Sequence, residues 1–167
     1  MATITLKGNE IHTQGELPKV GSDAPLFTLV KSDLSLLSAS ELKGKKVVLN
    51  IFPSLDTGVC AASVRQFNKM AGEDLGAVVV NISKDLPFAH KRFCDSEGID
   101  NVINVSDFRD SNFADAYGTL IVDGPLAGLH SRAVVVVDED GNVIYTEQVP
   151  EITQEPDYEA VLRAVKG

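Results

Sequence analysis

The stretch KKVVLNIFPSLDTGVC, residues 45–60, decides the fold class of this 167-residue chain. Its first half, KKVVLNIF (45–52), contains a continuous apolar run of strand length, which is typical of a strand covered on both faces of a sheet. From about Thr57 to Met70 the pattern becomes helical, because apolar residues recur at one-turn spacing from Cys60 onward. A buried strand that leads into an amphipathic helix indicates an α/β protein in which this strand is central.

The rest of the sequence supplies further strands and helices in alternation. Residues 3–14 alternate around Gly8-Asn9 and predict an N-terminal hairpin, and residues 132–149 predict two strands joined by a turn at 138–142. The other predicted elements are strands over 26–33, 76–83 and 101–108, and helices over 38–45, 86–98, 112–118 and 156–167.

The order of these elements predicts an α/β, thioredoxin-like fold, with a central mixed β-sheet flanked by helices and an N-terminal β-hairpin. A flavodoxin-like sheet would need another crossover helix between the last two strands. No GxGxxG segment follows a strand, so a nucleotide site is not expected. The length predicts one domain, residues 1–167.

Composition and charge narrow the function classes. Hydrophobic residues make up 44% and charged residues 23%, as in ordinary globular proteins, and 24 acidic against 15 basic side chains give a formal net charge of -9. Because no basic stripe is present, nucleic acid and anionic membrane are not expected as partners. The first residues carry no secretory signal, and no window approaches the ~20 apolar residues of a membrane span. We therefore expect a cytoplasmic protein.

The chain has only two cysteines, Cys60 and Cys94. In a cytoplasmic protein a permanent disulfide is not expected, so the two are either small buried hydrophobic residues or a working redox pair. No CxxC motif occurs, and no Cys/His cluster has zinc spacing, since His12, His90 and His130 are scattered. No metal or other cofactor is expected.

Cys60 falls near the beginning of its predicted helix, where unpaired backbone N–H groups and the helix dipole favour a thiolate. Thr57 is close enough for its hydroxyl to share the pocket, and Pro53 ends strand pairing because it has no N–H. Alternatively, Cys60 is the first core residue of an amphipathic helix, with Thr57 as its N-cap and Pro53 as a strand terminator. Spacing alone leaves both interpretations open.

The second cysteine favours the redox interpretation. The apolar stripe of its predicted helix is formed by Leu86, Ala89 and Phe93. Cys94 lies at the edge of this stripe rather than in its middle. A thiol at such an edge is accessible to a reaction partner.

The segment FPSLDTGVCAASVRQFN (52–68) contains a Pro-x-x-x-Thr-x-x-Cys motif, as Pro53, Thr57 and Cys60. In this motif the sequence resembles the peroxiredoxin family. In the other residues of the same segment it is similar to the bacterial thiol peroxidase subfamily. The resemblance extends over nearly the whole chain. It includes GSDAPLFTL (21–29), KRFC (91–94), DGPLAGLHSRAVVVVDEDGNV (123–143) and the tail EITQEPDY (151–158).

The resemblance implies a thiol-dependent peroxidase of the atypical two-cysteine kind, in which one chain supplies both cysteines. Cys60 would be the peroxidatic cysteine, which forms a sulfenic acid with hydrogen peroxide or an organic hydroperoxide. Cys94 would be the resolving cysteine, which closes an intramolecular Cys60–Cys94 disulfide. Arg132 would complete the site with Thr57 and Pro53. Thioredoxin would recycle the enzyme, which would act in antioxidant defence as a homodimer, without bound metal, haem or nucleotide.

Two other functions fit the cysteines. A disulfide oxidoreductase or redox sensor would use Cys60–Cys94 exchange without peroxide turnover. It lacks the CxxC spacing, and Ser131-Arg132 stands where thioredoxin-type oxidoreductases have a proline. A non-enzymatic binding module would leave both thiols inert and slow to alkylate at neutral pH.

The remaining polar residues have simpler interpretations. Arg132 could be a charged residue that caps a strand and pairs with an acid. His130 could pair with Cys60 in a cysteine hydrolase, but lone histidines in loops are more often solvated and no oxyanion-hole motif is visible. Asp56 and Asp85 are expected to be turn or cap residues.

Overall fold

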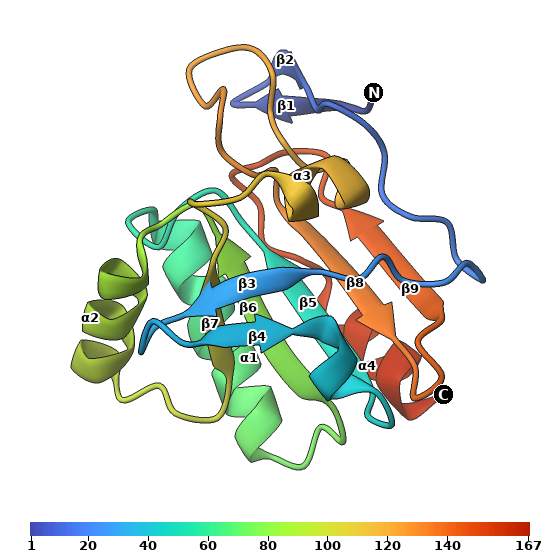
Figure 1. Cartoon of the computed structure of the whole chain (residues 1–167). Helices are drawn as coiled ribbons and strands as arrows, with labels where there is room; N and C mark the ends of the chain where they lie inside the picture. The colour runs from blue at the N-terminus through green and yellow to red at the C-terminus, as the bar shows by residue number, and fades with distance from the viewer.

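A seven-stranded mixed sheet forms the centre of the protein, and this computed structural model describes residues 1–167 (Figure 1). Its strand order is β4 (Leu36–Ser38), β3 (Thr28–Lys31), β7 (Ile103–Ser106), β6 (Val78–Ser83), β5 (Val47–Ile51), β8 (Ala133–Val137) and β9 (Val143–Gln148). Strands β5, β6 and β7 are mutually parallel, whereas the other pairs are antiparallel. The predicted mixed sheet is confirmed, although β4 was missed because three residues are too short to show a pattern.

Strand β5 lies inside this sheet, as predicted. It pairs in parallel with β6 and antiparallel with β8, and all five of its residues are buried. Alternate residues of β5 belong to different hydrophobic clusters, because Val48 packs on one face of the sheet and Leu49 on the other. The continuous apolar run therefore reflects a strand with protein on both sides.

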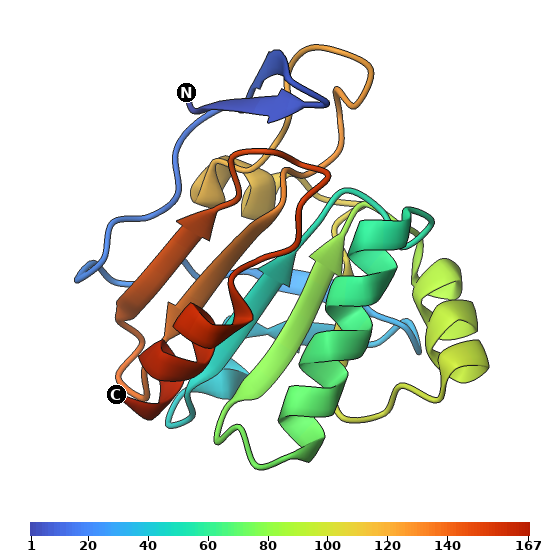
Figure 2. The same ribbon diagram turned by 180° about the vertical axis from the view of Figure 1, so that it is seen from behind.

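Helices cover both faces of the sheet. On one face lie α1 (Gly58–Gly72) and α4 (Tyr158–Lys166), which stand side by side in Figure 2. They enclose a cluster of Val48, Phe67, Leu75, Val79, Val134, Val136, Val161 and Val165. The other face is covered by α3 (Asn112–Tyr117) and the short 3-10 helix η1 (Ala39–Leu42), and the β3–β4 end of the sheet itself crosses in front of the central strands in Figure 1. None of the helices has the length and apolar character needed to cross a membrane.

The N-terminal hairpin forms a separate two-stranded sheet at the top of the view in Figure 1. Its strands are β1 (Thr3–Leu6) and β2 (Asn9–His12), so the predicted hairpin is confirmed. The turn falls at Lys7-Gly8, one residue before the predicted position, and both turn residues have positive φ, as a tight two-residue hairpin turn requires. The buried side of the hairpin belongs to a cluster of Ile4, Ile11, Ile121 and Ile152.

Helix α2 (Pro87–Glu97) packs differently from the prediction. The predicted apolar stripe is confirmed only in part: half-buried Phe93 packs against the cluster that contains Cys60, whereas Leu86 is 45% exposed. His90, outside the predicted stripe, is the only buried side chain of the helix. Figures 1 and 2 show α2 at the outer side of the molecule, beyond α1, where no further layer covers it. The helix that carries Cys94 is therefore held to the protein by one buried side chain, His90, and by the half-buried Phe93 and Cys94.

Candidate active site

Strand pairing brings Cys60 and Arg132 together although they are 72 positions apart. In the antiparallel pair of β5 and β8, Ile51 faces Ala133, so the end of β5 and the beginning of β8 lie at one edge of the sheet. The chain leaves β5 through a short loop and enters α1, whose first turn holds Cys60. Figure 2 shows the ends of β5 and β6 and the beginning of α1 at this edge.

Cys60 and Arg132 form a buried pair. Arg132 Nη2 donates to Cys60 Sγ at 3.3 Å, and the exposed fractions of the two residues are 2% and 0%. A buried guanidinium is costly unless it finds a partner, and an ionised sulfur would supply the opposite charge. The interpretation of Arg132 as a strand cap paired with an acid is wrong, because its side chain bonds only the sulfur and the carbonyl oxygen of Ile152.

One nitrogen of the Arg132 guanidinium has no hydrogen-bond partner in the protein. Arg132 Nε donates to the Ile152 carbonyl at 2.9 Å, which fixes the plane of the group. Arg132 Nη1 is buried and has no hydrogen-bond partner. Because a buried donor without an acceptor is costly, Nη1 is suited to bind a substrate oxygen beside the sulfur.

Thr57 and Pro53 shape the loop that leads to Cys60. Thr57 is the N-cap of α1: its Oγ1 accepts from the Cys60 N–H at 3.3 Å and donates to the Ser54 carbonyl at 3.2 Å. Phe52 N–H still donates to β6, but the buried Pro53 has no N–H and ends the ladder. The structural interpretations of both residues hold here, and their catalytic roles stay predictions.

Asp85 is a residue whose importance the sequence did not reveal. Its carboxylate accepts from Ser54 Oγ at 2.9 Å, from Leu55 N–H at 2.8 Å and from Ser83 Oγ at 2.6 Å. Asp85 thus anchors the loop before Cys60 to the end of the neighbouring strand β6. Its position directly after a buried parallel strand, whose end meets the end of β5, was the available signal.

His90 attaches α2 to the same edge of the sheet. Its Nε2 lies 3.0 Å from Ser83 Oγ, and its Nδ1 is buried without a partner. Burial lowers the pKa of His90 to about 4, and the nearby charge of Asp85 opposes this shift. The imidazole is therefore neutral at pH 7.

Cys94 is half-buried on α2, and both cysteines are free. It packs against a cluster formed by Phe52, Leu55, Cys60, Val64 and Ile99. Burial, and to a smaller extent the charge of Asp95, raises the pKa of Cys94 to about 11. The Cys94 thiol is therefore protonated and weakly nucleophilic while α2 is folded.

His130 lies in a buried network instead of in solvent, so the expectation of a solvated histidine is wrong. Its Nε2 is 2.7 Å from Asp107 Oδ2 and its Nδ1 is 2.8 Å from Thr119 Oγ1. Lys84 Nζ lies 3.3 Å from the same Asp107 oxygen. Both ring nitrogens are occupied, so His130 cannot act as a base for Cys60 and the cysteine hydrolase loses its support.

The chemistry available at this edge is therefore that of a thiol beside a fixed cation. The Cys60 thiol lies beside a guanidinium with one free donor and at a capped helix N-terminus. The guanidinium and the helix N-terminus both favour negative charge on sulfur or oxygen. No group of three or more His, Cys, Asp or Glu side chains is placed to hold a metal ion.

The sequence of this chain matches one family model and several curated proteins over most of its length. The model of the Redoxin family, described as Redoxin, matches residues 19–162. The thiol peroxidases of Mycobacterium tuberculosis (strain ATCC 25618 / H37Rv) and Mycobacterium bovis (strain ATCC BAA-935 / AF2122/97) are each 60% identical to this chain over 165 residues, which is 99% of either chain.

Solved structures give the same result for the fold. A peroxiredoxin-like protein from Aquifex aeolicus superposes with a TM-score of 0.93 at 42% identity, over 99% of this chain and 96% of that chain. A thiol peroxidase from Chromobacterium violaceum has a TM-score of 0.90 at 20% identity, over 98% and 95%, and its likeness is one of fold. The predicted thioredoxin-like fold is confirmed.

Proposed function

Because the chain belongs to the Redoxin family and is a thiol-dependent peroxidase of the peroxiredoxin type, we propose that Cys60 is its peroxidatic cysteine and Cys94 its resolving cysteine. The observation that carries this proposal is the buried contact of 3.3 Å between Arg132 Nη2 and Cys60 Sγ. The half-buried Cys94 thiol belongs to the same apolar cluster as Cys60 and has no other assigned partner.

In the first step, the Cys60 thiolate attacks the terminal oxygen of a hydroperoxide. The O–O bond breaks, the sulfur becomes a sulfenic acid, and the leaving oxygen takes a proton and departs as water or an alcohol. Arg132 faces the sulfur with Nη2, and its free Nη1 can bind the peroxide oxygens as charge moves onto them. Thr57 and Pro53 would border the approach to the sulfur.

In the second step, the Cys94 sulfur attacks the sulfenic acid, water leaves, and the Cys60–Cys94 disulfide forms. A disulfide requires the two Cα atoms within about 7 Å, and both cysteines lie inside folded helices, so we propose that α2 unwinds locally. His90 is its only buried side chain, which makes this opening inexpensive.

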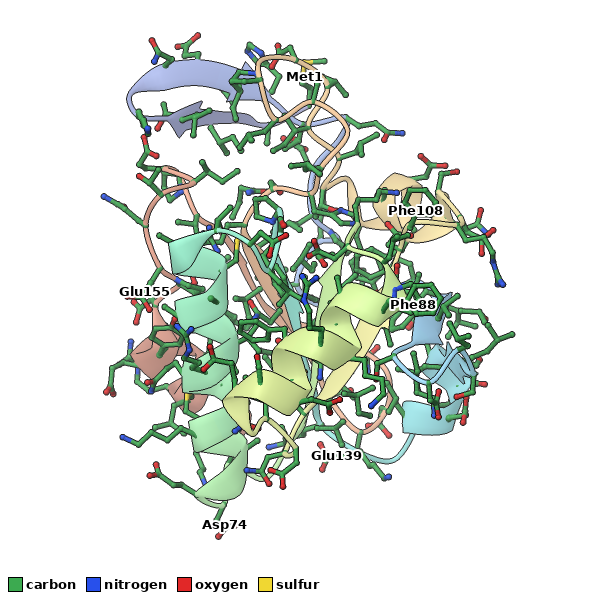
Figure 3. The ribbon with its side chains drawn as sticks, turned by 90° about the vertical axis from the view of Figure 1, so that its left-hand side faces the viewer. Met1, Asp74, Phe88, Phe108, Glu139 and Glu155 are labelled. Carbon is green, nitrogen blue, oxygen red and sulfur yellow. The ribbon has the colours of Figure 1, made fainter.

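We propose thioredoxin as the dithiol that reduces this disulfide, and the cytoplasm as the location. Two free cysteines without a structural disulfide suit a reducing compartment. We also propose a homodimer, since Leu86, Phe88 and Phe108 are exposed large apolar side chains near α2, and Figure 3 labels Phe88 and Phe108 on the same side of the molecule.

The test treats the reduced protein with one equivalent of cumene hydroperoxide and maps cysteine modification by intact mass and peptide analysis. Wild type should form the intramolecular disulfide within seconds. Cys94→Ser should stop at a Cys60 sulfenic acid, and Cys60→Ser should not react. If both thiols of the wild type stay reduced, or if Cys60→Ser is oxidised at the wild-type rate, the assigned roles are wrong.

A further inference from the structure

The Arg132 guanidinium depends on a loop that follows strand β9. Its Nε donates to the carbonyl oxygen of Ile152, and this is the only bond from its side chain to the protein other than the one to Cys60. The Arg132 backbone is tied to the same region, because its carbonyl accepts from Val149 N–H at 3.0 Å and from Gln148 Nε2 at 3.1 Å. The position of the guanidinium beside the sulfur therefore depends on where Ile152 is held.

Ile152 is held by the N-terminal hairpin. Its N–H donates to the Thr5 carbonyl at 2.9 Å, and Thr5 N–H donates to the Pro150 carbonyl at 2.8 Å, so strand β1 pairs with this loop. The buried Ile152 side chain packs in the cluster with the inward isoleucines Ile4 and Ile11 of the hairpin. The carbonyl that orients Arg132 thus lies on a segment braced by the first residues of the chain.

Glu151 joins the hairpin to the loop through one carboxylate. It accepts from Thr5 Oγ1 at 2.8 Å, from Lys7 N–H at 3.1 Å and from Gly8 N–H at 2.9 Å. It also accepts from the N–H and the hydroxyl of Thr153, at 3.0 and 2.7 Å. The pKa of Glu151 lies well below its usual range because the Thr153 N–H, the Thr153 hydroxyl and the Gly8 N–H donate to it.

We propose that Glu151 and the N-terminal hairpin position Arg132 for its work on Cys60, by fixing the Ile152 carbonyl that accepts from Arg132 Nε. This inference rests on the proposed role of Arg132 at the sulfur. When the carboxylate is lost, the loop keeps its backbone bonds to Thr5 but loses its ties to the hairpin turn and to Thr153, and the Ile152 carbonyl orients the guanidinium less firmly. A displaced Arg132 stabilises the Cys60 thiolate and the peroxide oxygens less well.

The decisive variant is Glu151→Gln, and the hairpin offers a matched control. Glu10→Gln removes the same charge from an exposed side chain of the same hairpin that bonds no other residue. Arg132→Lys serves as the reference for complete loss of the guanidinium. Each variant is measured for kcat/KM with cumene hydroperoxide and, in the Cys94→Ser background, for the pH dependence of Cys60 alkylation by iodoacetamide.

We expect Glu151→Gln to lower kcat/KM about 10-fold, less than the ~10²-fold expected for Arg132→Lys, because a displaced donor costs less than a missing one. The alkylation profile of Cys60 should move to higher pH in both variants and stay unchanged in Glu10→Gln. Glu151→Asp, which keeps both acceptor oxygens, should recover part of the rate. A hairpin that only stabilises the fold would lower the melting temperature without moving the alkylation profile of the folded protein.

The two proposals fail in different ways. If Arg132→Lys moves the profile but Glu151→Gln behaves as Glu10→Gln, the positioning role is overturned and the role of Arg132 stands. If Arg132→Lys itself leaves rate and profile unchanged, the proposed role of Arg132 falls and this inference falls with it. Should Glu151→Gln not fold, Thr5→Val removes the bonds of the Thr5 hydroxyl to the same carboxylate and to the Pro150 carbonyl, and its failure to move the profile would overturn the inference.

Discussion

His90 Nε2 lies 3.0 Å from Ser83 Oγ, and this contact joins the only buried side chain of α2 to the end of strand β6. Ser83 Oγ donates its proton to Asp85 at 2.6 Å, so His90 Nε2 is the donor to Ser83. The same Asp85 carboxylate holds the loop before Cys60. The helix of Cys94 and the loop of Cys60 are therefore fastened to one point of the sheet.

Replacing His90 with alanine should loosen α2 and speed disulfide formation. Loss of a buried side chain and its hydrogen bond should cost about 1–3 kcal/mol of unfolding free energy. Each ~1.4 kcal/mol makes local opening about tenfold more frequent, so a loss of about 1–3 kcal/mol should accelerate the step from sulfenic acid to disulfide by about 5- to 150-fold. Quenched-flow mass analysis measures this step, and Ser96→Ala, at an exposed position of α2, is the control. An unchanged rate in His90→Ala would show that α2 opening does not limit resolution.

Acid should loosen α2 in the wild type through the same histidine. The pKa of His90 is lowered from 6.5 to about 4, first by burial. A depressed folded-state pKa means that the neutral imidazole contributes stability that is complete above pH 6.5 and is lost as the pH falls through about 4. Hydrogen exchange over residues 87–97, corrected for its intrinsic pH dependence, should rise on going from pH 7 to pH 4. His90→Gln cannot titrate, so an equal rise in that variant would contradict the assignment.

Cys94 should resist alkylation in the folded protein at neutral pH. Its pKa is raised from 9.0 to about 11, chiefly by burial. Because the folded-state pKa is the higher one, the buried thiol contributes stability below about pH 9 that is lost as the pH rises through about 11. In Cys60→Ser, alkylation by iodoacetamide should be slow at pH 7 and increase toward pH 11, whereas urea should remove the protection. Asp95→Asn should lower the midpoint only slightly, and rapid labelling of folded Cys60→Ser at pH 7 would refute this prediction.

The parts of the fold that the sequence predicted correctly are those with a strong pattern. Strand β5 and helix α1 followed from a continuous apolar run and from one-turn spacing, because burial on two faces and burial on one face leave different patterns. Helix α2 was misread in part, because Phe93 packs inward whereas Leu86 is exposed and the polar His90 is the buried residue. Periodicity shows that Leu86 and Phe93 share a face of the helix, but not how much of that face the rest of the chain covers.

The candidate site could be predicted only where a side chain carries the chemistry. Cys60 and Arg132 were chosen by residue type and resemblance, and the register of β5 with β8 brings them together. The acceptor that orients Arg132 is a backbone carbonyl, that of Ile152, which leaves no mark in a sequence. The roles of Asp85 and Glu151 depend on the paths of loops, and charge alone could not distinguish these two from the other acidic residues.

Thr57 allows capping and catalysis to be separated by substitution. Its Oγ1 caps α1 by accepting from the Cys60 N–H, and asparagine is an equally good cap. Thr57→Val should lose about 1 kcal/mol of unfolding free energy along with activity. Thr57→Asn should keep the wild-type melting temperature and yet lose about 10²-fold in kcat/KM, because an amide does not reproduce the hydroxyl that we propose to border the peroxide. Thr57→Ser should keep both properties. If Thr57→Asn is fully active, the hydroxyl serves only as a cap, and stabilisation of the peroxide oxygens rests on Arg132 and the helix N-terminus.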